Sequence, residues 1–333
     1  FDDVLLLPKY SDFLPSQASI ESKLTKNIVL KTPLISAAMD TVTESKMAIS
    51  LAETGGIGII HKNNSIDEQA AQVKAVKKYE SGIVRDPVTI NSKQSIGELK
   101  QLTNELSISG MPVVDNGKLK GIVTSRDFRY AENMESEVSS IMTSFEKLIT
   151  VEEGFSQQDV MQLMYKNRIE KILVLDNDKN LSGLVTMKDI EKSAQHPNAT
   201  KDSSGRLQVG AALGTSEDTI ERAQALFESG VDVFVVDSAH GHSKNVIETI
   251  KMLKEKFKDV DIIGGNIATA EAATELVRAG ADAVKVGMGP GSICTTRIIA
   301  GIGVPQISAI LEIKKALVGR DTVSYTHLRA HET

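Results

Sequence analysis

The hydrophobic positions of this chain form short, continuously apolar runs that alternate with segments of helical period. Such runs are typical of parallel strands that are buried on both faces. The segments between them carry apolar residues three and four positions apart, as an amphipathic helix does. The pattern therefore predicts parallel β/α units over residues 1–82 and again over residues 198–320. The six buried strands that we expect are 33–38, 57–61, 207–212, 233–237, 261–266 and 283–286.

The connections between these strands favour an eight-stranded (β/α) barrel, of which about six units are present. Helix signals fall where that fold needs them: Ser65 is followed three residues later by Glu68, a capping box for a helix that runs to about Tyr79. A doubly wound sheet is the alternative fold. It expects a glycine-rich phosphate turn after the first strand, where this chain has Ala-Ala-Met-Asp at 37–40.

An internal repeat interrupts the β/α units between residues 83 and 197. Residues 111–128 align with residues 172–190, and each copy reads as strand, turn, strand and a helix opened by Thr-x-x-Asp. Because the repeat follows the second predicted helix, we expect it to be an insertion in the barrel. The first copy is assigned to residues 83–141 and the second to residues 142–197.

The two copies resemble a tandem pair of cystathionine-β-synthase-type (CBS) domains. In that family the threonine and aspartate that open each last helix contact the phosphate and ribose of a nucleotide. The resemblance implies that adenine or guanine nucleotides bind here as regulators. The alternative is that these side chains are N-terminal caps. The residues concerned are Thr124, Asp127, Thr186 and Asp189.

Composition excludes several classes of partner. The chain has no Trp, an aromatic content of 4% and a net charge of −6, which argues against nucleic acid and against anionic membrane surfaces. No apolar run approaches the roughly 18 residues of a membrane span, and no signal peptide is visible. A single cysteine excludes an internal disulfide and fits a reducing compartment. We therefore expect a cytoplasmic protein.

The stretch whose residues are best suited to catalysis follows the strand at 283–286. Gly287, Gly289 and Gly291 favour an irregular loop, and Cys294, the only cysteine, lies at its end. A lone cysteine is most often a small buried apolar residue. In a glycine-rich loop, with two threonines and an arginine directly behind it, the thiol is instead placed to act as a nucleophile.

The sequence Gly-Met-Gly-Pro-Gly-Ser-Ile-Cys-Thr-Thr at 287–296 resembles the cysteine loop of the inosine monophosphate dehydrogenases and guanosine monophosphate reductases. The resemblance extends from residue 1 to about residue 310. Its other segments are Phe-Asp-Asp-Val-Leu-Leu at 1–6, Ala-Met-Asp-Thr-Val-Thr-Glu at 38–44, Gly-Gly-Ile-Gly-Ile-Ile-His at 55–61, Asp-Ser-Ala-His-Gly-His at 237–242 and Gly-Gly-Asn at 264–266.

The resemblance implies a reaction. Cys294 is expected to add to C2 of inosine monophosphate (IMP), hydride passes to NAD, and water then releases xanthosine monophosphate. Thr296 occupies the position of the family's proton-relay threonine. The alternative for Thr296 is a loop hydroxyl that is bonded to backbone.

The resemblance also implies binding roles. The ribose hydroxyls of the nicotinamide riboside are expected at Asp237, and the substrate phosphate at Ser292. The full cofactor set is Asp237, Ser238, Gly287, Met288 and Gly289. The substrate set is Met39, Asn266, Gly291 and Ser292. A potassium ion is expected on the carbonyl oxygens of Gly289, Gly291 and Cys294, because hard cations take oxygen ligands.

Two classes of function remain open. The first is a purine-nucleotide oxidoreductase, which the family implies to be a homotetramer when complete. Within this class the reductase shares the cysteine loop but normally lacks the inserted repeat, so residues 83–197 favour the dehydrogenase. The second is a nucleotide-sensing regulatory protein in which the barrel is vestigial and the repeat binds the ligand.

The ends of the chain carry their own expectations. Residue 1 lies inside a family-like motif, so we expect a fragment at the N-terminus. After about Ile310 the family has two more strands, a phosphate-binding segment and a flap whose Arg-Tyr pair activates water. Residues 321–333 have neither helical nor strand period and are expected to be a foreign tail. An open barrel of this kind is expected to be inactive and to self-associate through strand edges at 33–38 and 283–286.

Overall fold

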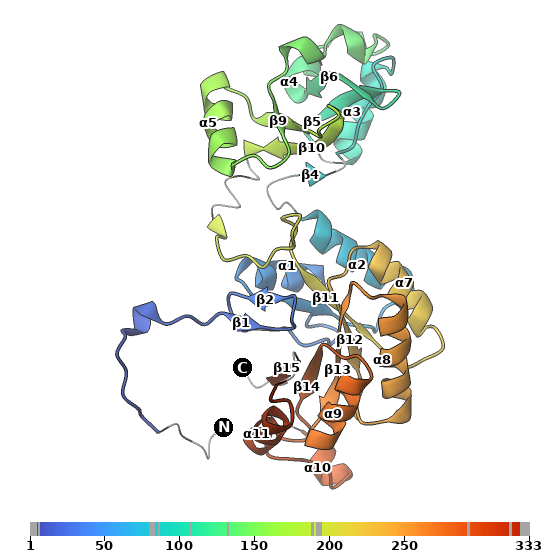
Figure 1. Ribbon diagram of the computed structural model, residues 1–333. Helices are drawn as coiled ribbons and strands as arrows, with labels where there is room; N and C mark the ends of the chain where they lie inside the picture. The colour runs from blue at the N-terminus through green and yellow to red at the C-terminus, as the bar shows by residue number, and fades with distance from the viewer. Residues whose placement is uncertain are drawn as a thin grey trace. The chain divides into compact units, whose positions relative to one another are not determined.

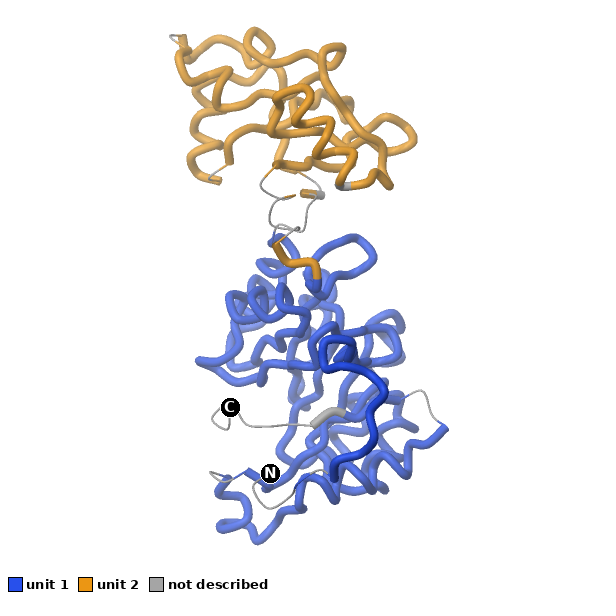
Figure 2. The backbone as a smooth tube through the Cα atoms, turned by 90° about the vertical axis from the view of Figure 1, so that its left-hand side faces the viewer, with its two compact units in different colours: residues 1–79, 198–333 blue, residues 80–197 orange. Residues whose placement is uncertain are grey.

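The computed structural model describes residues 5, 7–79, 84–85, 87–106, 108–131, 133–187, 190, 195–291, 294–319 and 322–326. The chain divides into two compact units. Unit 1 comprises Phe1–Tyr79 with Asn198–Thr333, and unit 2 comprises Glu80–Pro197 (Figure 2). In the described part of the chain, no helix is both long and apolar enough to cross a membrane.

Unit 1 is built on a six-stranded sheet in the order β15-β14-β13-β12-β11-β3, and all of its strands are parallel. Strands that follow one another from β11 to β14 are neighbours in the sheet, as expected for successive β/α units. Figure 1 shows the connecting helices along one face. The strands are β3 Gly58–Ile60, β11 Val209–Leu213, β12 Val233–Asp237, β13 Asp261–Ile267, β14 Ala283–Val286 and β15 Val323–Thr326.

The helices of unit 1 lie close to their predicted positions. Ser65 and Glu68 form the expected capping box, in which Glu68 Oε2 accepts from Ser65 N at 2.9 Å. In the first of these helices, at 45–53, Ala48 and Ala52 are buried and Met47 is 45% exposed. The helices are α1 Ser45–Glu53, α2 Ile66–Lys78, α7 Thr219–Glu228, α8 Lys244–Lys256, α9 Ala270–Arg278, α10 Thr296–Ile299 and α11 Gln306–Ala316.

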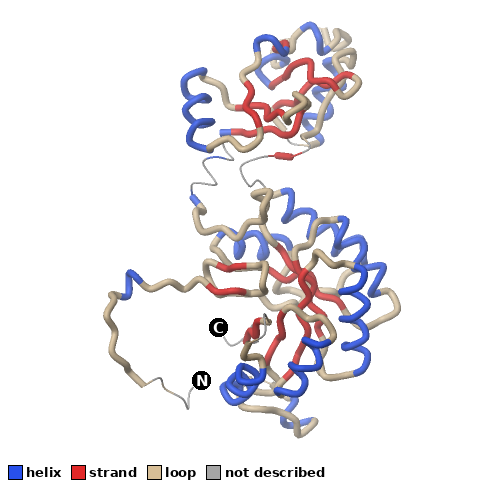
Figure 3. Tube along the Cα trace, in the orientation of Figure 1, coloured by secondary structure: helices blue, strands red, loops and turns tan. Residues whose placement is uncertain are grey.

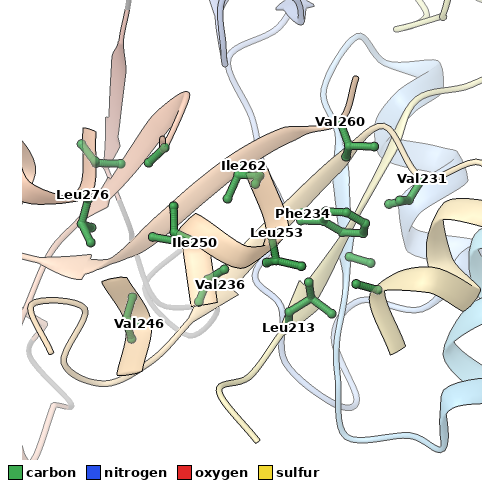
Figure 4. Packing of buried hydrophobic residues seen from close by; sticks show 14 of the residues in the cluster. Leu213, Val231, Phe234, Val236, Val246, Ile250, Leu253, Val260, Ile262 and Leu276 are labelled. Atoms are coloured by element: carbon green, nitrogen blue, oxygen red, sulfur yellow. The ribbon is translucent and has the colours of Figure 1, made fainter. Parts of the chain in front are cut away.

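Burial on both faces explains why the strands read as unbroken apolar runs. In β12, Phe234 and Val236 pack against the helices, and Figure 4 shows them within that cluster. Val233 and Val235 belong to a second cluster on the opposite face. A hairpin of β1 (Ser22–Lys23) and β2 (Val29–Leu30) adds its apolar residues to this second cluster, which include Leu24, Ile28 and Leu30.

Two expectations about the sheet edges are wrong. The strand predicted at 33–38 is reduced to a parallel bridge between Ile35 and Ile57, because the chain turns away at Ala37, whose carbonyl accepts from Met39 N. Residues 323–326 were expected to lack a strand, but they pair with all of β14. The unpaired backbone groups of an edge strand accept an extended neighbour even when its side-chain pattern is weak. Residues 327–333 lie outside the described residues.

Unit 2 holds two sheets of the same construction, drawn in red in Figure 3. In the first half, β5 pairs antiparallel with β6, and β6 pairs with β7 at Gly121. In the second half, β9 pairs with β10, and β10 pairs with β4 at the equivalent Gly183. The strands are β4 Val84–Arg85, β5 Gly110–Asp115, β6 Lys118–Thr124, β7 Thr143–Ser144, β8 Thr150–Glu152, β9 Lys171–Leu175 and β10 Leu181–Thr186.

Each half of unit 2 also has its own helices and its own core, and a further cluster joins the two halves. The shared cluster consists of Leu119, Ile122, Leu173, Leu175 and Leu184. In the first half, the β5–β6 turn is Asn116-Gly117 with φ of 50° and 77°, a hairpin turn that requires positive φ at both positions. The principal helices are α3 Ile96–Glu105, α4 Ser125–Phe128 and α5 Gln157–Asn167.

A buried ion cluster lies where the chain leaves unit 1 and where it returns. Lys77 Nζ, near the end of α2, donates to Asp202 Oδ2 at 3.0 Å, to Asp232 Oδ2 at 2.9 Å and to the carbonyl of Leu207 at 3.0 Å. Burial raises the pKa of Asp232. Burial also opposes ionisation of Asp202, but Lys77 and Arg206 hold the pKa of that carboxyl below its usual value. The two carboxyl groups that share this lysine therefore have pKa values shifted in opposite directions.

We predict that Lys77→Ala lowers the free energy of unfolding of unit 1 by about 3–5 kcal/mol, because it leaves two buried carboxyl groups without their cation. Urea unfolding followed by circular dichroism measures the change. Lys78→Ala is the matched control, since Lys78 is the exposed neighbour and its loss should cost less than about 0.5 kcal/mol. Equal stability of the two variants would contradict a structural role for the cluster.

Candidate active site at the carboxyl ends of the strands

Polar residues gather where the parallel strands of unit 1 end. His61 follows β3, Asp237 ends β12, Asn266 is the penultimate residue of β13, and the cysteine loop follows β14. Carboxyl ends of parallel strands meet at one edge of the sheet, which is the active face of β/α barrels. The parallel registers of these strands provide this convergence.

Unpartnered polar atoms mark the same edge. Among the described residues, His61 Nε2, Asn266 Oδ1 and Gln306 Oε1 are buried side-chain atoms without a hydrogen-bond partner. Gln306 is near the start of α11, and its Nε2 donates to the carbonyl of Val286, the last residue of β14. Buried polar atoms are almost always paired. These three, of the five unpartnered atoms among the described residues, lie beside the ends of β3, β13 and β14.

Asp237 is held from two sides. Lys285, which is 4% exposed, donates through Nζ to Asp237 Oδ1 at 2.7 Å, and Lys62 Nζ donates to the Asp237 carbonyl at 3.1 Å. Gly265 of β13 lies between Lys285 and Asp237 in register. A Cβ at Gly265 would stand 2.6 Å from the Lys285 Cβ, so only glycine lets the lysine pass over β13.

The loop after β12 is fastened to β13 by backbone hydrogen bonds. Ser238 N donates to the Gly265 carbonyl at 2.9 Å, and Asn266 N donates to the Ser238 carbonyl at 2.8 Å. Gly241 N donates to the Asn266 carbonyl at 2.7 Å, and a Cβ at Gly241 would stand 2.8 Å from that oxygen. The structure thus brings together three predicted site residues: Asp237, Ser238 and Asn266.

The glycine-rich loop packs against the segment that precedes α11. Gly287 N donates to the Ile267 carbonyl at 2.9 Å, and the Met288 carbonyl accepts from Val304 N at 3.0 Å. Gly289 has φ +74°, and a Cβ there would stand 2.8 Å from the Ile302 carbonyl oxygen. The loop therefore needs glycine at this position for both conformation and space.

Cys294 is buried, with an exposed fraction of 5%. Its thiol donates to Thr296 Oγ1 at 3.3 Å, and its backbone N donates to the Gly291 carbonyl at 3.0 Å. The predicted catalytic pair is therefore in contact. Ser292, predicted to hold the phosphate, lies outside the described residues.

Of the three carbonyls predicted to ligate potassium, that of Gly291 also accepts from Arg297 Nη2 at 3.2 Å. With the Cys294 N–H it therefore receives two donors. In the described part of the chain, no group of three or more His, Cys, Asp or Glu side chains is arranged to hold a metal ion.

The loop that carries Met39 lies against the end of β3. The Met39 carbonyl accepts from the backbone N of Val42 and Thr43, and Asp40 Oδ2 accepts from Asn63 Nδ2 at 2.7 Å. His61, which is 3% exposed, accepts through Nδ1 from Asn63 N. Its Nε2 is 3.9 Å from the carboxylate of Glu44. Met39 itself is half-buried.

Sequence reasoning missed Lys285 and Lys62 as site residues. A signal existed for the first, since Lys285 is the one charged residue within the apolar strand Ala-Val-Lys-Val. A buried lysine needs a partner, but the sequence does not show which carboxylate lies two strands away. Lys62 lies just after a strand end, where a solvent-exposed lysine is common, so its position in the sequence did not indicate a role in the site.

Of the four residues of unit 2 that were predicted to contact a nucleotide, the structure describes Thr124, Asp127 and Thr186. The N–H and Oγ1 of Thr124 donate to Asp127 Oδ2 at 2.6 and 2.9 Å, so both residues form the capping box of the alternative interpretation. They also line a cleft of about 460 Å³ between the halves of the unit. Thr186 is half-buried at the end of β10, and Asp189 lies outside the described residues. The cleft also has cationic lining residues, which are Arg126, Arg129, Lys147 and Lys171.

With this geometry established, the family follows from comparison with known proteins. Residues 1–324 match the model of the IMP dehydrogenase / GMP reductase domain, and the chain belongs to this family. It is 50% identical over 321 residues to an inosine-5'-monophosphate dehydrogenase of Haemophilus influenzae, covering 96% of this chain and 66% of the relative. It is 52% identical over 319 residues to the enzyme of that name from Aquifex aeolicus, covering 95% and 65%. The chain thus spans just under two thirds of these relatives.

Solved structures of GMP reductase are also similar. The chain superposes on GMP reductase from Trypanosoma brucei in complex with guanosine 5'-triphosphate with a TM-score of 0.82 and 37% identity, covering 98% of this chain and 85% of that one. Coverage this high includes the inserted unit. The expectation that residues 83–197 distinguish dehydrogenase from reductase is therefore wrong, because a reductase matches them too.

We predict that Lys285→Met lowers the free energy of unfolding by about 2 kcal/mol, because it removes the charged hydrogen bond to Asp237. The double variant Lys285→Met/Asp237→Asn should lose less than the sum of the two single changes, as a contacting pair does. Urea unfolding measures all three. Lys251→Met, an exposed position on α8, is the control. Additive effects would show that the pair is not energetically coupled.

Proposed function

We propose that this chain carries the catalytic cysteine and the cofactor-binding residues of an NAD-dependent IMP dehydrogenase. The observation that carries the proposal is the buried thiol of Cys294, 3.3 Å from the Thr296 hydroxyl, in a glycine-rich loop at the carboxyl edge of the sheet. The identity of 50–52% with proteins named as this dehydrogenase supports it.

The chemistry follows from the substrate. C2 of the hypoxanthine ring lies between two nitrogens and is electron-poor, so a thiolate adds there. The Cys294 Sγ–C2 bond forms, and the C2–H bond breaks with its electron pair leaving as hydride. NAD, when bound, supplies the hydride acceptor. Water then adds to the thioimidate carbon, the C–S bond breaks, the thiolate is regenerated and xanthosine monophosphate leaves with release of one proton.

Thr296 is proposed to handle the protons of these steps. Its hydroxyl accepts from the Cys294 thiol in this structure, so it is positioned to receive the proton when the thiolate forms. A hydroxyl both accepts and donates, which is what a relay between thiol and water requires. The Cys294 thiol is buried and Thr296 is half-buried, so the pair is partly shielded from bulk solvent.

The cofactor assignment rests on Asp237. A carboxylate accepts hydrogen bonds from ribose hydroxyls, and its side chain is 24% exposed, so a ligand can reach it. Lys285 fixes its orientation. We assign the loop backbone at 287–289, with Ser238, to the nicotinamide end of the cofactor.

The substrate assignment uses Asn266, Met39 and the glycine-rich loop at the same edge. The unpaired Oδ1 of Asn266 is a natural acceptor for a donor on the base. Met39 supplies an apolar surface for the purine, and we assign the phosphate to Gly291 and Ser292. Backbone N–H groups of a glycine-rich turn bind phosphate without a basic side chain.

A potassium ion is proposed on the carbonyl oxygens of Gly289, Gly291 and Cys294. The donor set is chemically suitable, because hard cations prefer oxygen ligands. Since Arg297 donates to the Gly291 oxygen, cation and guanidinium compete for it. The ion would stabilise the loop that presents the thiol.

Unit 2 is proposed to be a CBS pair that binds adenine or guanine nucleotides as regulators. The cationic cleft lined by Thr124 and Asp127 supports this role. We also propose a homotetramer in the cytoplasm. Residues 7–20 run as an extended arm away from the body of unit 1 (Figure 1), and several of their large apolar side chains are exposed, as in a segment that packs on another subunit. They include Leu7, Tyr10, Phe13 and Leu14.

The second candidate is a GMP reductase, which the similarity to the Trypanosoma brucei structure favours. Both reactions use a cysteine at C2, so the geometry described here suits either. The two are separated by one assay of a full-length protein that carries this sequence. Reduction of NAD with IMP supports the dehydrogenase, whereas oxidation of a reduced nicotinamide cofactor with GMP supports the reductase.

We predict that Cys294→Ser in such a full-length protein abolishes turnover while sparing IMP binding. An alcohol at neutral pH does not replace a thiolate as nucleophile without a strong base beside it. Steady-state rates and calorimetric IMP binding are the measurements. Retention of more than about a tenth of the rate would exclude the covalent mechanism, and loss of IMP binding as well would point to a folding defect.

We further predict that deletion of residues 83–197, with the ends rejoined by a short Gly-Ser linker, leaves catalysis intact. Among the residues that the structure describes, the two core clusters of unit 1 are formed by residues of unit 1 itself. Adenine and guanine nucleotides should lose any effect on rate or assembly. A deletion variant that folds, as judged by circular dichroism, but does not turn over would contradict the regulatory role of unit 2.

A further inference from the structure

The segment between β12 and α8 is tied to the next β/α unit near both of its ends. Residues 238–243 have no regular secondary structure. At the start of the segment, the backbone hydrogen bonds described above join Ser238 to the end of β13. Near its other end, His242 Nε2 lies 2.9 Å from Glu275 Oε2 on α9. An ionised carboxylate only accepts hydrogen bonds, so the histidine nitrogen is the donor in this contact.

Glu275 stands on a fixed support. Its helix, α9, packs on the core of unit 1 through the buried side chains of Ala272, Ala273 and Leu276. The Glu275 side chain is 44% exposed and that of His242 is 28% exposed. The helix therefore determines where the carboxylate lies, and the carboxylate in turn holds the histidine. Because both side chains reach solvent, either one can be replaced without opening the core.

The last residues of the segment lack the side-chain cap that usually fixes the start of a helix. Ser243 is the N-cap residue of α8, and a serine in that place usually accepts a hydrogen bond from the backbone of the first turn. Ser243 makes no such bond. The ion pair between Lys244 and Glu248, at 3.7 Å, joins two residues of α8 itself. The contact of His242 with Glu275 is thus what connects this end of the segment to α9.

A series of contacts leads from His242 back to Ser238, which is one of the residues assigned to the cofactor. The rings of His240 and His242 meet edge to face, with their centroids 6.4 Å apart. The backbone N of His240 donates to Ser238 Oγ at 3.3 Å, and the Ser238 hydroxyl donates to the His240 carbonyl at 3.4 Å. Fixing His242 therefore restricts His240 and, through it, the Ser238 hydroxyl.

We propose that His242 and Glu275 are positioning residues, which hold residues 238–243 in the conformation that receives the nicotinamide end of the cofactor. This inference rests on the cofactor site proposed above, and it adds two residues that do not themselves contact the ligand. A segment that is ordered before binding does not have to be ordered by the ligand. Loss of the pair should therefore raise the KM for NAD and leave kcat and the KM for IMP nearly unchanged, as loss of uniform binding does.

Steady-state kinetics of a full-length protein that carries this sequence test the proposal, with NAD varied at saturating IMP. Glu275→Ala should raise the KM for NAD about fivefold, the effect expected when one partly exposed charged pair is lost. Glu271→Ala is the matched control, because it removes the same charge from an exposed position one turn earlier on α9. The control should change this KM less than about twofold, since the expected effect comes from the contact and not from the charge.

Variants of the histidine separate a positioning role from a general loss of structure. His242→Ala should reproduce the effect of Glu275→Ala, and the double variant should be no worse than either single variant, because both remove the same contact. His242→Gln keeps an N–H donor for the carboxylate and should restore the KM for NAD to nearly its original value. Thermal unfolding checks that each variant is folded. Glu275→Met, which keeps the length of the side chain without the acceptor, repeats the measurement if the alanine variant is unstable.

The outcomes separate this inference from the function on which it rests. An unchanged protein that uses no nicotinamide cofactor, with either IMP or GMP, would overturn the cofactor site and the positioning role together. An active protein whose KM for NAD is insensitive to both alanine variants would overturn the positioning role alone. So would an equal effect of Glu271→Ala, additive effects in the double variant, or a failure of His242→Gln to restore the KM.

Discussion

The parallel hydrogen-bonded ladder from β3 to β14 is the constraint on which the rest of unit 1 depends. Because both of its faces are buried, a shift of register would break two cores at once. Fixed register in turn brings the carboxyl ends of four strands to one edge. The pairing of Asp237 with Gly265, and of Gly265 with Lys285, shows the precision of this arrangement: a polar contact forms between strands that are not neighbours.

Much of this fold is present in the sequence as local information. The strands of unit 1 were recognisable because double burial requires unbroken apolar runs, and the Ser65 capping box was recognisable because it needs two residues three positions apart. The errors arose where tertiary contacts decide. Pairing with β14 makes a strand of residues 323–326, and the turn at Ala37 reduces the strand expected at 33–38 to a single bridge.

The residues of the candidate site also divide into those that were predicted from the sequence and those that depend on tertiary contacts. Cys294 was predicted from residue type and from its glycine-rich loop, whereas the roles expected of Thr296 and Asp237 were implied by the family resemblance. Lys285 was not predicted, since the carboxylate that pairs with it is 48 residues away along the chain. Gln306 was not predicted either. The lack of a hydrogen-bond partner at its Oε1 follows from the packing of α11 on β14, which the sequence does not show.

The Lys77 cluster has a consequence for how this chain accommodates a large inserted unit. Its three carboxyl and carbonyl partners tie the last turn of α2 to the returning segment at Asp202 and to the start of β12. The two ends of the insertion are thereby held by unit 1 itself, and unit 1 does not need unit 2 to keep them in place. Such a junction is a natural grafting point, where another compact domain can replace the inserted one without rebuilding the catalytic sheet.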